Sequence, residues 1–449
     1  MLSNTSWVTR IASLVFLLSI FTINWESDRT QLATLFTAYS LAFIAYLVLI
    51  QQRDLKFNQL AVLAISAQVI SMLFEPYLSN DYYRFLWDGE MAWNSINAFD
   101  YKPTEVIRQP FLRDNAYIQD IYGGMSDLSR KNYSCYPTVN QSYFIGATAF
   151  SSSIVINTFL LKSLIVLTEL VGAIYLLKTL RLLNFSSNRI WILFLNPLWI
   201  VECTGNVHFE GVMISFLFIA LYFILQKKAT LGGSWLAIAV QIKLVPLIFL
   251  PFFLRYLGWT KTILLSIMTV GLALSIGLIH LDTANIANFL KSLTLYFNVF
   301  EFNSLIFYNY IEYGKTINEW NPIKIYGPRL SQLSFFLVLV QAFWGNTNTW
   351  QKLMSRITVA FFIYLLFATT VHPWYILPVL AISLFTNYSF PIIWSFLIFF
   401  SYVIYALDTS SAIEARTIVT IEYVIVIAVF LYEIIRKRPL LSFLAAQKK

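Results

Sequence analysis

The stretch Leu231–Leu254, LGGSWLAIAVQIKLVPLIFLPFFL, is long and apolar enough to cross a membrane once. Its middle holds Gln241 and Lys243, and Pro246 and Pro251 follow. Proline interrupts helical hydrogen bonding, and a lysine at mid-membrane depth is energetically costly. The stretch is therefore either one span or a re-entrant pair of helices that enters and leaves on the same side. A re-entrant pair implies a cavity, because irregular backbone is tolerated inside a membrane only where protein or water surrounds it.

The distribution of basic residues favours the re-entrant alternative. If Leu231–Leu254 is re-entrant, one side of the membrane collects most lysines and arginines of the short loops, and the other side holds few beyond Arg29 and Arg416. If it spans once, this pattern breaks in the middle of the chain. Because basic loops stay in the cytoplasm, the sequence predicts that both termini are cytoplasmic. The basic residues of that side are Arg53, Lys56, Lys178, Arg181, Arg189, Lys227, Lys228, Arg255, Lys261, Lys352, Arg356, Arg436, Lys437 and Arg438.

The composition of the whole chain is that of a polytopic membrane protein. Of 449 residues, 58% are hydrophobic and 12% are charged, whereas soluble proteins are typically about 25% charged. The net charge of +8 fits basic residues at span ends better than nucleic-acid binding. At roughly 20 apolar residues per span, we predict an all-α bundle of about twelve spans plus the re-entrant pair. The predicted hydrophobic cores are Trp7–Ile23, Gln31–Ile50, Leu60–Leu78, Phe159–Leu180, Ile190–Val201, Gly211–Leu225, Ile263–Ile279, Leu330–Phe343, Ile357–Thr370, Trp374–Phe385, Ile392–Leu407 and Ile418–Ile435.

Two long loops of this single predicted domain, 1–449, fall on the outer side. They cover residues 79–157 and 281–329. The first is unusually acidic, and a polar, acidic loop in an apolar chain is a candidate seat of chemistry. The two cysteines, Cys135 and Cys203, have no metal-ligand spacing, and a single disulfide between them is an open alternative. The acidic residues of the first loop are Asp81, Asp88, Glu90, Asp100, Glu105, Asp114, Asp120 and Asp127.

The start of the first outer loop holds a carboxylate close to the membrane exit. Asp81 is followed by Arg84 and Asp88, and a helix here would place all three on one face. A carboxylate at the membrane surface can accept a proton from a sugar hydroxyl, and a nearby arginine can hold a phosphate. The alternative is an ordinary solvated loop with a local ion pair.

Three further places carry polar residues at or near membrane depth. His208 and Glu210 lie at the predicted outer end of a span and could line a polar cleft. Lys243 would meet a lipid phosphate at the apex of the re-entrant pair, or pair with an intramembrane acid such as Glu169. In HPWY at 372–375, proline, tryptophan and tyrosine suit a span start, which leaves His372 without a structural reason. The topology puts these histidines on the outer side with Asp81 and Glu301.

These residues also carry a resemblance to a known family. The run NDYYRFLWDG at 80–89, followed by INAF at 96–99, resembles the S-N-D-x-Y-R-Y-x-W-D-G … x-N-P-Y signature of bacterial polyprenol-phosphate-mannose-type glycosyltransferases of the GT-C class. Further segments resemble the family's motifs in the same order. They are YPTVNQ at 136–141, GNVHFE at 205–210, KLVP at 243–246, EFN at 301–303 and HPWY at 372–375.

The resemblance implies a GT-C-like inverting glycosyltransferase in the bacterial inner membrane, with an extracytoplasmic active site. It implies a hexose, with mannose as the first expectation, carried by a polyprenyl-phosphate donor to a glycan or glycolipid acceptor. No cofactor other than this donor and no nucleic-acid partner is implied. A divalent cation is an open alternative, for which Asp81, Asp88 and Glu210 are the candidate ligands; no metal ligand is assigned.

The resemblance also implies roles for individual residues. Asp81 is the expected catalytic base. Lys243 and Arg84 are the expected contacts of the donor phosphate, and Asp88 is expected to hold Arg84 in place. The other expected substrate contacts are His208, His372, Glu210, Asn303 and Tyr136, with Trp87 and Glu301 in support.

Other classes of membrane protein remain open from the sequence. A lipid-linked sugar transporter or flippase would use similar intramembrane polar residues, but it predicts related halves with broken helices in both. A polysaccharide polymerase or ligase would also have a large outer loop, but it would take a lipid diphosphate and would not require the Asp81 motif. A non-enzymatic scaffold is the least specific alternative.

Overall fold

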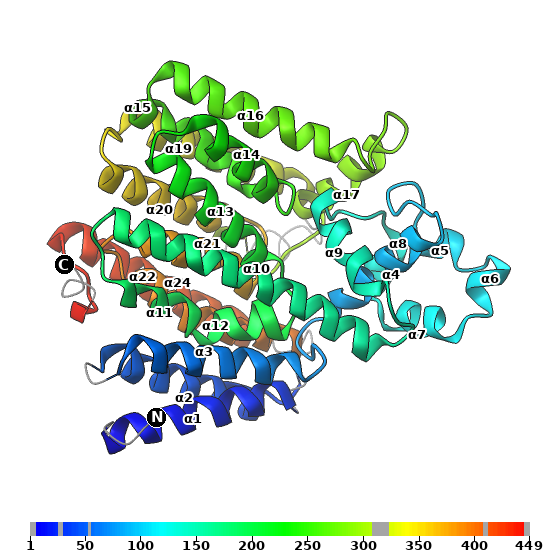
Figure 1. Cartoon of the computed structure of the whole chain (residues 1–449), viewed down its shortest axis with the longest axis horizontal. Helices are drawn as coiled ribbons and strands as arrows, with labels where there is room; N and C mark the ends of the chain where they lie inside the picture. The colour runs from blue at the N-terminus through cyan, green and yellow to red at the C-terminus, as the bar shows by residue number, and fades with distance from the viewer. Residues whose placement is uncertain (1–5, 26–29, 53–54, 308–322, 407–411, 444–449) are drawn as a thin grey trace.

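The structure is a computed structural model that describes residues 6–25, 30–52, 55–307, 323–406 and 412–443 (Figure 1). Within these ranges the chain is helical, and the one strand-like feature is an isolated bridge between Phe302 and Thr370. The predicted all-α class is confirmed. The presence of several apolar helices long enough to cross a membrane is confirmed as well. The helices that meet this test are α1 (Trp7–Trp25), α2 (Leu32–Gln51), α10 (Ile154–Leu182), α16 (Trp259–Gly277) and the Arg416–Arg436 part of α24 (Ala412–Arg436).

A sixth span results if two helices that meet at a sharp bend are counted together. The helical segment Pro197–Gly205, which ends in the π-helical η2 (Ile200–Gly205), and helix α13 (Glu210–Leu225) are bent by 110° relative to one another. Between them Val207 has a φ of 63°, which is a strained conformation for a β-branched residue. The bend turns the segment before α13 into the interior, where His208 is buried. The sequence predicts about twelve spans. This is more than the helices that meet the length and composition test, so the number stays a prediction.

The stretch around Lys243 is a helical hairpin. Helix α14 (Ala229–Val240) runs alongside α13 and α16, and the chain then returns through η3 (Val245–Phe253) and α15 (Leu254–Leu257) (Figure 1). The returning arm ends beside the end of α13, since the Tyr256 hydroxyl donates to the Leu225 carbonyl at 3.2 Å. At the apex, the Gln241 amide donates to the Ala273 carbonyl near the other end of α16 at 2.6 Å. Both ends of the hairpin therefore lie on the same side, while its placement in a bilayer stays a prediction.

The remaining helices complete the bundle around this hairpin. Helix α19 begins earlier than the predicted span Leu330–Phe343, and it packs against α20. The η3 arm of the hairpin contacts both helices, so the hairpin and this pair face one another. The further elements are α3 (Phe57–Met72), η1 (Ser187–Ile190), α11 (Trp191–Phe194), α12 (Pro197–Trp199), α19 (Ile323–Trp344), α20 (Trp350–Phe367), η4 (Pro373–Ile376), α21 (Leu377–Ser383), α22 (Phe390–Leu397), η5 (Ile398–Tyr402) and α23 (Val403–Ala406).

The first long loop folds into a module of short helices at one end of the bundle, on the right in Figure 1. Its central contact is between the first and last of these helices, α4 and α9. Gly89 allows this approach, because a Cβ there would lie 2.7 Å from the Phe144 carbonyl carbon. The helices are α4 (Asp81–Trp93), α5 (Pro103–Val106), α6 (Pro110–Arg113), α7 (Ala116–Gly124), α8 (Asp127–Lys131) and α9 (Thr138–Thr148).

Helix α17 (Ile286–Asn298), from the second long loop, binds this module through polar contacts. The Asn288 amide donates to the Phe99 carbonyl at 3.0 Å, and the Ser292 hydroxyl donates to the Tyr133 carbonyl at 3.0 Å. Near the end of α16, the Asn97 amide donates to the His280 carbonyl at 2.7 Å. The two loops that the sequence places on the outer side are therefore joined.

Glu90 on α4 gives the loop module a pH-dependent stability. Burial raises its pKa to about 7 from an ordinary value of 4.5, and a hydrogen bond with Tyr117 offsets part of this. Because the folded state holds this proton more tightly than the unfolded state, stability is lost as pH rises from below 4.5 through about 7. The slope is at most about 1.4 kcal/mol per pH unit, and solvent exposure reduces it.

We therefore expect Glu90→Gln to raise the thermal unfolding midpoint at pH 8 and to leave it unchanged near pH 4. Asp120→Asn, an exposed acid on α7, is the matched control and should have no effect at either pH. A stabilisation by Glu90→Gln that is equal at both pH values would contradict the raised pKa.

Candidate functional site

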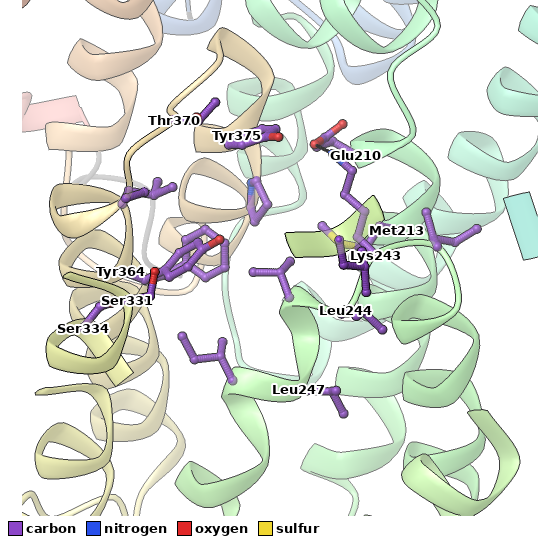
Figure 2. Close-up of a pocket in the computed structure, with 18 of the residues that line it drawn as sticks. Glu210, Met213, Lys243, Leu244, Leu247, Ser331, Ser334, Tyr364, Thr370 and Tyr375 are labelled. Atoms are coloured by element: carbon purple, nitrogen blue, oxygen red, sulfur yellow. Dashed lines mark hydrogen bonds and ion pairs between the residues drawn. The ribbon is translucent and has the colours of Figure 1, made fainter. Parts of the chain in front are cut away.

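Two cavities lie side by side where the loop module meets the bundle. The polar cavity, of about 460 Å³, is walled by α4, the loop before α9, the bend before α13 and the segments around Glu301 and His372. The apolar cavity, of about 570 Å³, lies between the hairpin and the α19–α20 pair (Figure 2). Both volumes fall in the range of small-molecule sites. The residues that line both cavities are Cys135, Tyr136, Glu210, Lys243 and Tyr375.

The polar cavity brings together most of the residues that the sequence predicts as site residues. They come from segments far apart in the chain, and the fold alone makes them neighbours. Asp88 and Trp87 lie behind the wall and do not line it, and Asn303 lies elsewhere. The predicted residues that line the polar cavity are Asp81, Arg84, Tyr136, His208, Glu210, Lys243, Glu301 and His372.

Asp81 is the first residue of α4, and its side chain lines the polar cavity. Its backbone N–H donates to the Ser79 hydroxyl at 3.3 Å. A carboxylate in the first turn interacts favourably with the helix dipole. The stretch is helical, which is the condition under which the sequence places Asp81, Arg84 and Asp88 on one face.

Arg84 and Asp88 form a buried ion pair one turn further along α4. The Arg84 Nε lies 2.6 Å from an Asp88 oxygen, and its Nη1 donates to the Ser129 and Asn132 carbonyls at 2.7 and 2.9 Å. Asp88 also accepts from the Ser134 hydroxyl at 2.6 Å. These contacts support the predicted tether of Arg84 by Asp88. They also occupy most of the guanidinium, and only its Nη2 is without a partner among the described residues. The phosphate contact predicted for Arg84 therefore has less support than the one predicted for Lys243.

Lys243 projects from the apex of the hairpin toward Glu210, the first residue of α13 (Figure 2). The two side chains form an ion pair, and the Lys243 ammonium also lies 4.8 Å from the centre of the Tyr375 ring. The alternative partner Glu169 lies elsewhere, where it accepts from Gln68 at 2.9 Å. The pair stands at the boundary of the two cavities, because both residues line both of them.

His208 and His372 belong to one column of stacked rings. Trp374 stacks on His208 with 3.4 Å between ring centres and on His372 with 4.5 Å. His372 continues the column onto Phe302 at 4.6 Å, and its Nδ1 lies 3.3 Å from the Tyr405 hydroxyl. The column fixes both histidines in the wall of the polar cavity, as the sequence predicts for their location.

Asn303 lies apart from the other predicted substrate contacts. It lines neither cavity, although Glu301 two residues before it lines the polar one. Its amide donates to Glu422 of α24 at 3.3 Å, and its carbonyl accepts from the Tyr423 hydroxyl at 2.8 Å. Its φ of 45° turns the chain there, a conformation that asparagine tolerates better than most residues. Asn303 therefore anchors the wall segment, and the substrate contact predicted for it stays a prediction.

The comparisons with known proteins place the chain in a family. A family model described as alpha-(1->6)-mannopyranosyltransferase, N-terminal domain, matches residues 5–259, which is more than half of the chain. The chain belongs to this family. The match covers α4, the bend before α13 and Lys243, whereas Glu301 and His372 lie beyond it. No solved structure matches the chain.

Curated relatives are named as mannosyltransferases. A GPI mannosyltransferase 1 of Candida albicans is 26% identical over 43% of this chain and 50% of its own length. Another, from Debaryomyces hansenii, is 28% identical over 32% of this chain and 35% of its own. An alpha-(1->6)-mannopyranosyltransferase A of Corynebacterium glutamicum is 32% identical over 15% of each. The chain spans half or less of the length of the curated relatives it matches.

Several residues of this mannopyranosyltransferase-family site were not singled out from the sequence. Asn140 lines the polar cavity, where its amide donates to the Ile242 carbonyl at 2.8 Å and its Oδ1 has no partner among the described residues. Trp374 and Tyr375 form part of the wall. All three lie inside motifs that carry the resemblance, so the motifs were the available signal. Glu422 was missed because nothing near it in the sequence marks it.

Tyr136 lines both cavities and keeps its proton. Burial, and then the charge of Asp81, raise the pKa of its hydroxyl well above the usual value. A protonated phenol can donate a hydrogen bond to an anionic or hydroxylated ligand, which agrees with the substrate contact predicted for Tyr136.

The candidate metal ligands do not come together. Within the described parts of the chain no group of three or more His, Cys, Asp or Glu side chains could hold a metal ion. Asp88 is engaged with Arg84 and Ser134 behind the cavity wall, so the set Asp81, Asp88 and Glu210 is not assembled. Cation dependence can be tested by chelation.

Cys135 is a natural reporter for the site. Cys135 and Cys203 are not joined by a disulfide, which removes that alternative. Cys203 is fully buried, whereas Cys135 lines both cavities. We expect a membrane-impermeant thiol reagent, added outside intact cells, to label Cys135 and not Cys203. Labelling should disappear in Cys135→Ser and persist in Cys203→Ser. Labelling only after the inner side is opened would contradict the predicted orientation.

Proposed function

We propose that this protein is an inverting glycosyltransferase that moves mannose from a polyprenyl-phosphate donor to a glycan or glycolipid on the outer side of the membrane. The observation that carries the proposal is the junction of a polar cavity holding Asp81 with an apolar cavity, with Lys243 between them. A lipid-linked sugar has the same division into a polar head, one phosphate and an apolar chain. The mannosyltransferase names of the relatives support the choice of sugar.

The polyprenyl chain would occupy the apolar cavity. Leu244 and Leu247 from the hairpin line this cavity (Figure 2). Its walls also include Ile248 from the hairpin, Phe335 from α19 and Phe361 from α20. Because the lipid tails of a bilayer are as apolar as these side chains, the chain would be held there by van der Waals packing and not by removal from water. The phosphate would then lie at Lys243, and the sugar would extend into the polar cavity.

The reaction would be a direct displacement at the anomeric carbon. An acceptor hydroxyl in the polar cavity loses its proton to the Asp81 carboxylate as its oxygen forms the new bond to the anomeric carbon. The bond between that carbon and the phosphate oxygen breaks, and polyprenyl phosphate leaves with the electron pair. Lys243 stabilises the developing charge on the phosphate. Attack opposite to the leaving group gives inversion.

The orientation is part of the proposal. Both termini would lie in the cytoplasm of a bacterial cell, about twelve spans would cross the plasma membrane, and the loop module would face outward. The excess of basic residues on one side of the predicted topology supports it.

Reconstitution tests the proposed activity. Purified protein in liposomes would receive radiolabelled polyprenyl-phosphate-mannose and a membrane glycolipid fraction, and the labelled product would be analysed for anomeric configuration. We expect transfer with a configuration opposite to that of the donor, and no transfer from a polyprenyl-diphosphate sugar. Transfer only from the diphosphate would favour a polymerase or ligase. Movement of the lipid across the bilayer without transfer would favour a transporter.

A further inference from the structure

One pair of opposite charges lies at the boundary between the two cavities, among the residues that the structure describes. Of the residues that line both cavities, only Lys243 and Glu210 are charged. They come from different elements, the hairpin apex and the first turn of α13. The Lys243 side chain is 31% exposed and Glu210 is 2% exposed. The lysine therefore reaches into the cavities, while the carboxylate stays in the wall.

The charges around the polar cavity do not favour an anion. Its lining holds the carboxylates of Asp81, Glu210 and Glu301 against the cations of Arg84 and Lys243. Arg84 is paired with Asp88 behind the wall. Lys243 is thus the cation best placed for a phosphate at the junction, and its charge is already balanced by Glu210.

A phosphate at the junction would have to compete with Glu210 for Lys243. The ammonium has three donors, and Glu210 and the Tyr375 ring engage it from two directions. If Lys243 moved to a phosphate, Glu210 would be left as a buried carboxylate, which is unfavourable. The other Glu210 oxygen, Oε2, already has no partner among the described residues, so the first turn of α13 would be the main remaining stabilisation of this carboxylate.

We infer that Glu210 is a release residue, whose carboxylate competes with the lipid phosphate for Lys243 and so limits how tightly polyprenyl phosphate is retained. This inference rests on the proposed function for the identity of the lipid. Transfer converts a phosphodiester into a phosphate monoester, which carries up to one more negative charge. The product would therefore bind a lone lysine more tightly than the donor does. Re-formation of the Glu210–Lys243 pair expels it.

The test is direct binding of farnesyl phosphate to the purified full-length protein in nanodiscs, with farnesol as the probe without phosphate. We expect Glu210→Gln to tighten farnesyl phosphate binding by about tenfold, which corresponds to about 1.4 kcal/mol, and to leave farnesol binding unchanged. Lys243→Gln should weaken farnesyl phosphate binding. In the Lys243→Gln background, Glu210→Gln should have no further effect, because the competition no longer exists.

Two outcomes would overturn the inference. One is that Glu210→Gln binds farnesyl phosphate more weakly than the parent protein does. The other is that Glu210→Gln raises the affinity equally with and without Lys243. If Glu210→Gln does not fold, Glu210→Asp replaces it in the test. This variant keeps the charge but shortens the side chain, so it should raise the affinity for farnesyl phosphate by a smaller factor. Because the assay needs no transfer, it separates this inference from the proposed function. If the variants bind farnesyl phosphate as expected but the protein transfers no mannose, the lipid-phosphate site is supported and the proposed reaction is rejected.

Discussion

Replacement of Asp81 by asparagine is expected to lower the transfer rate by about 10²–10⁴-fold, the usual contribution of a positioned general base. Asparagine keeps the size of the side chain but cannot accept the acceptor proton at neutral pH. Asp81 lines the polar cavity from the start of α4, so the loss should appear in the maximal rate, with little change in donor affinity. Single-turnover transfer from radiolabelled polyprenyl-phosphate-mannose measures it.

The matched control for this variant is Asp120→Asn, an exposed acid of the same loop module that lines neither cavity. It should transfer at the normal rate. Both variants should unfold at the temperature of the parent protein, which excludes a loss through misfolding. Full transfer by Asp81→Asn would reject Asp81 as the base and direct attention to Glu210 and Glu301, the other carboxylates of the cavity.

Removal of the Asp88 carboxylate is expected to be the most destabilising single change in the loop module. Asp88→Ala leaves the Arg84 guanidinium buried without its counter-charge, and breaking a buried ion pair in this way typically costs about 3–5 kcal/mol. Ser134 would also lose its acceptor. We expect a lower thermal unfolding midpoint and, because α4 loses the contact between Asp88 and Ser134, faster proteolysis of the module.

An exposed ion pair in the same module provides the comparison. Asp127→Ala removes the partner of Lys131, whose ammonium lies 3.0 Å from Asp127 on the surface of α8. The unfolding midpoint should not change measurably, since exposed pairs contribute little. If the two variants lower the midpoint equally, the Arg84–Asp88 pair has no special structural role, and Arg84 becomes available as the phosphate contact that the sequence predicts.

Much of the fold class followed from composition and local pattern. The spacing of Asp81, Arg84 and Asp88 would give a shared face if this stretch were helical, and α4 is that helix and has an Arg84–Asp88 pair. The hairpin at Leu231–Leu254 could be predicted because proline and lysine in an apolar run conflict with a single straight span. Span boundaries were less predictable, since several hydrophobic cores are short and a bent segment such as η2–α13 carries no distinct sequence period.

The sequence predicted which residues line the site better than it predicted which side chains they bond to or stack on. The motifs identified most residues that line the polar cavity. They could not show that Asn303 bonds to Glu422, which lies 119 residues away. Neither could they show that Trp374 stacks between His208 and His372. Motif spacing records which residues occur together, but the direction of each side chain depends on packing against elements remote in the sequence.

The sequence by itself determined that this is a helical membrane protein with a long acidic loop, because the apolar content, the scarcity of charge and the position of the acidic residues are properties of the chain. Only the tertiary structure decided how the polar residues pair. Lys243 and Glu210 are 33 residues apart, and they meet because the chain bends before α13 and the hairpin brings its apex to the same place. Such a contact depends on the relative position of two helices, which no local pattern specifies. That contact gives the junction of the two cavities its chemistry.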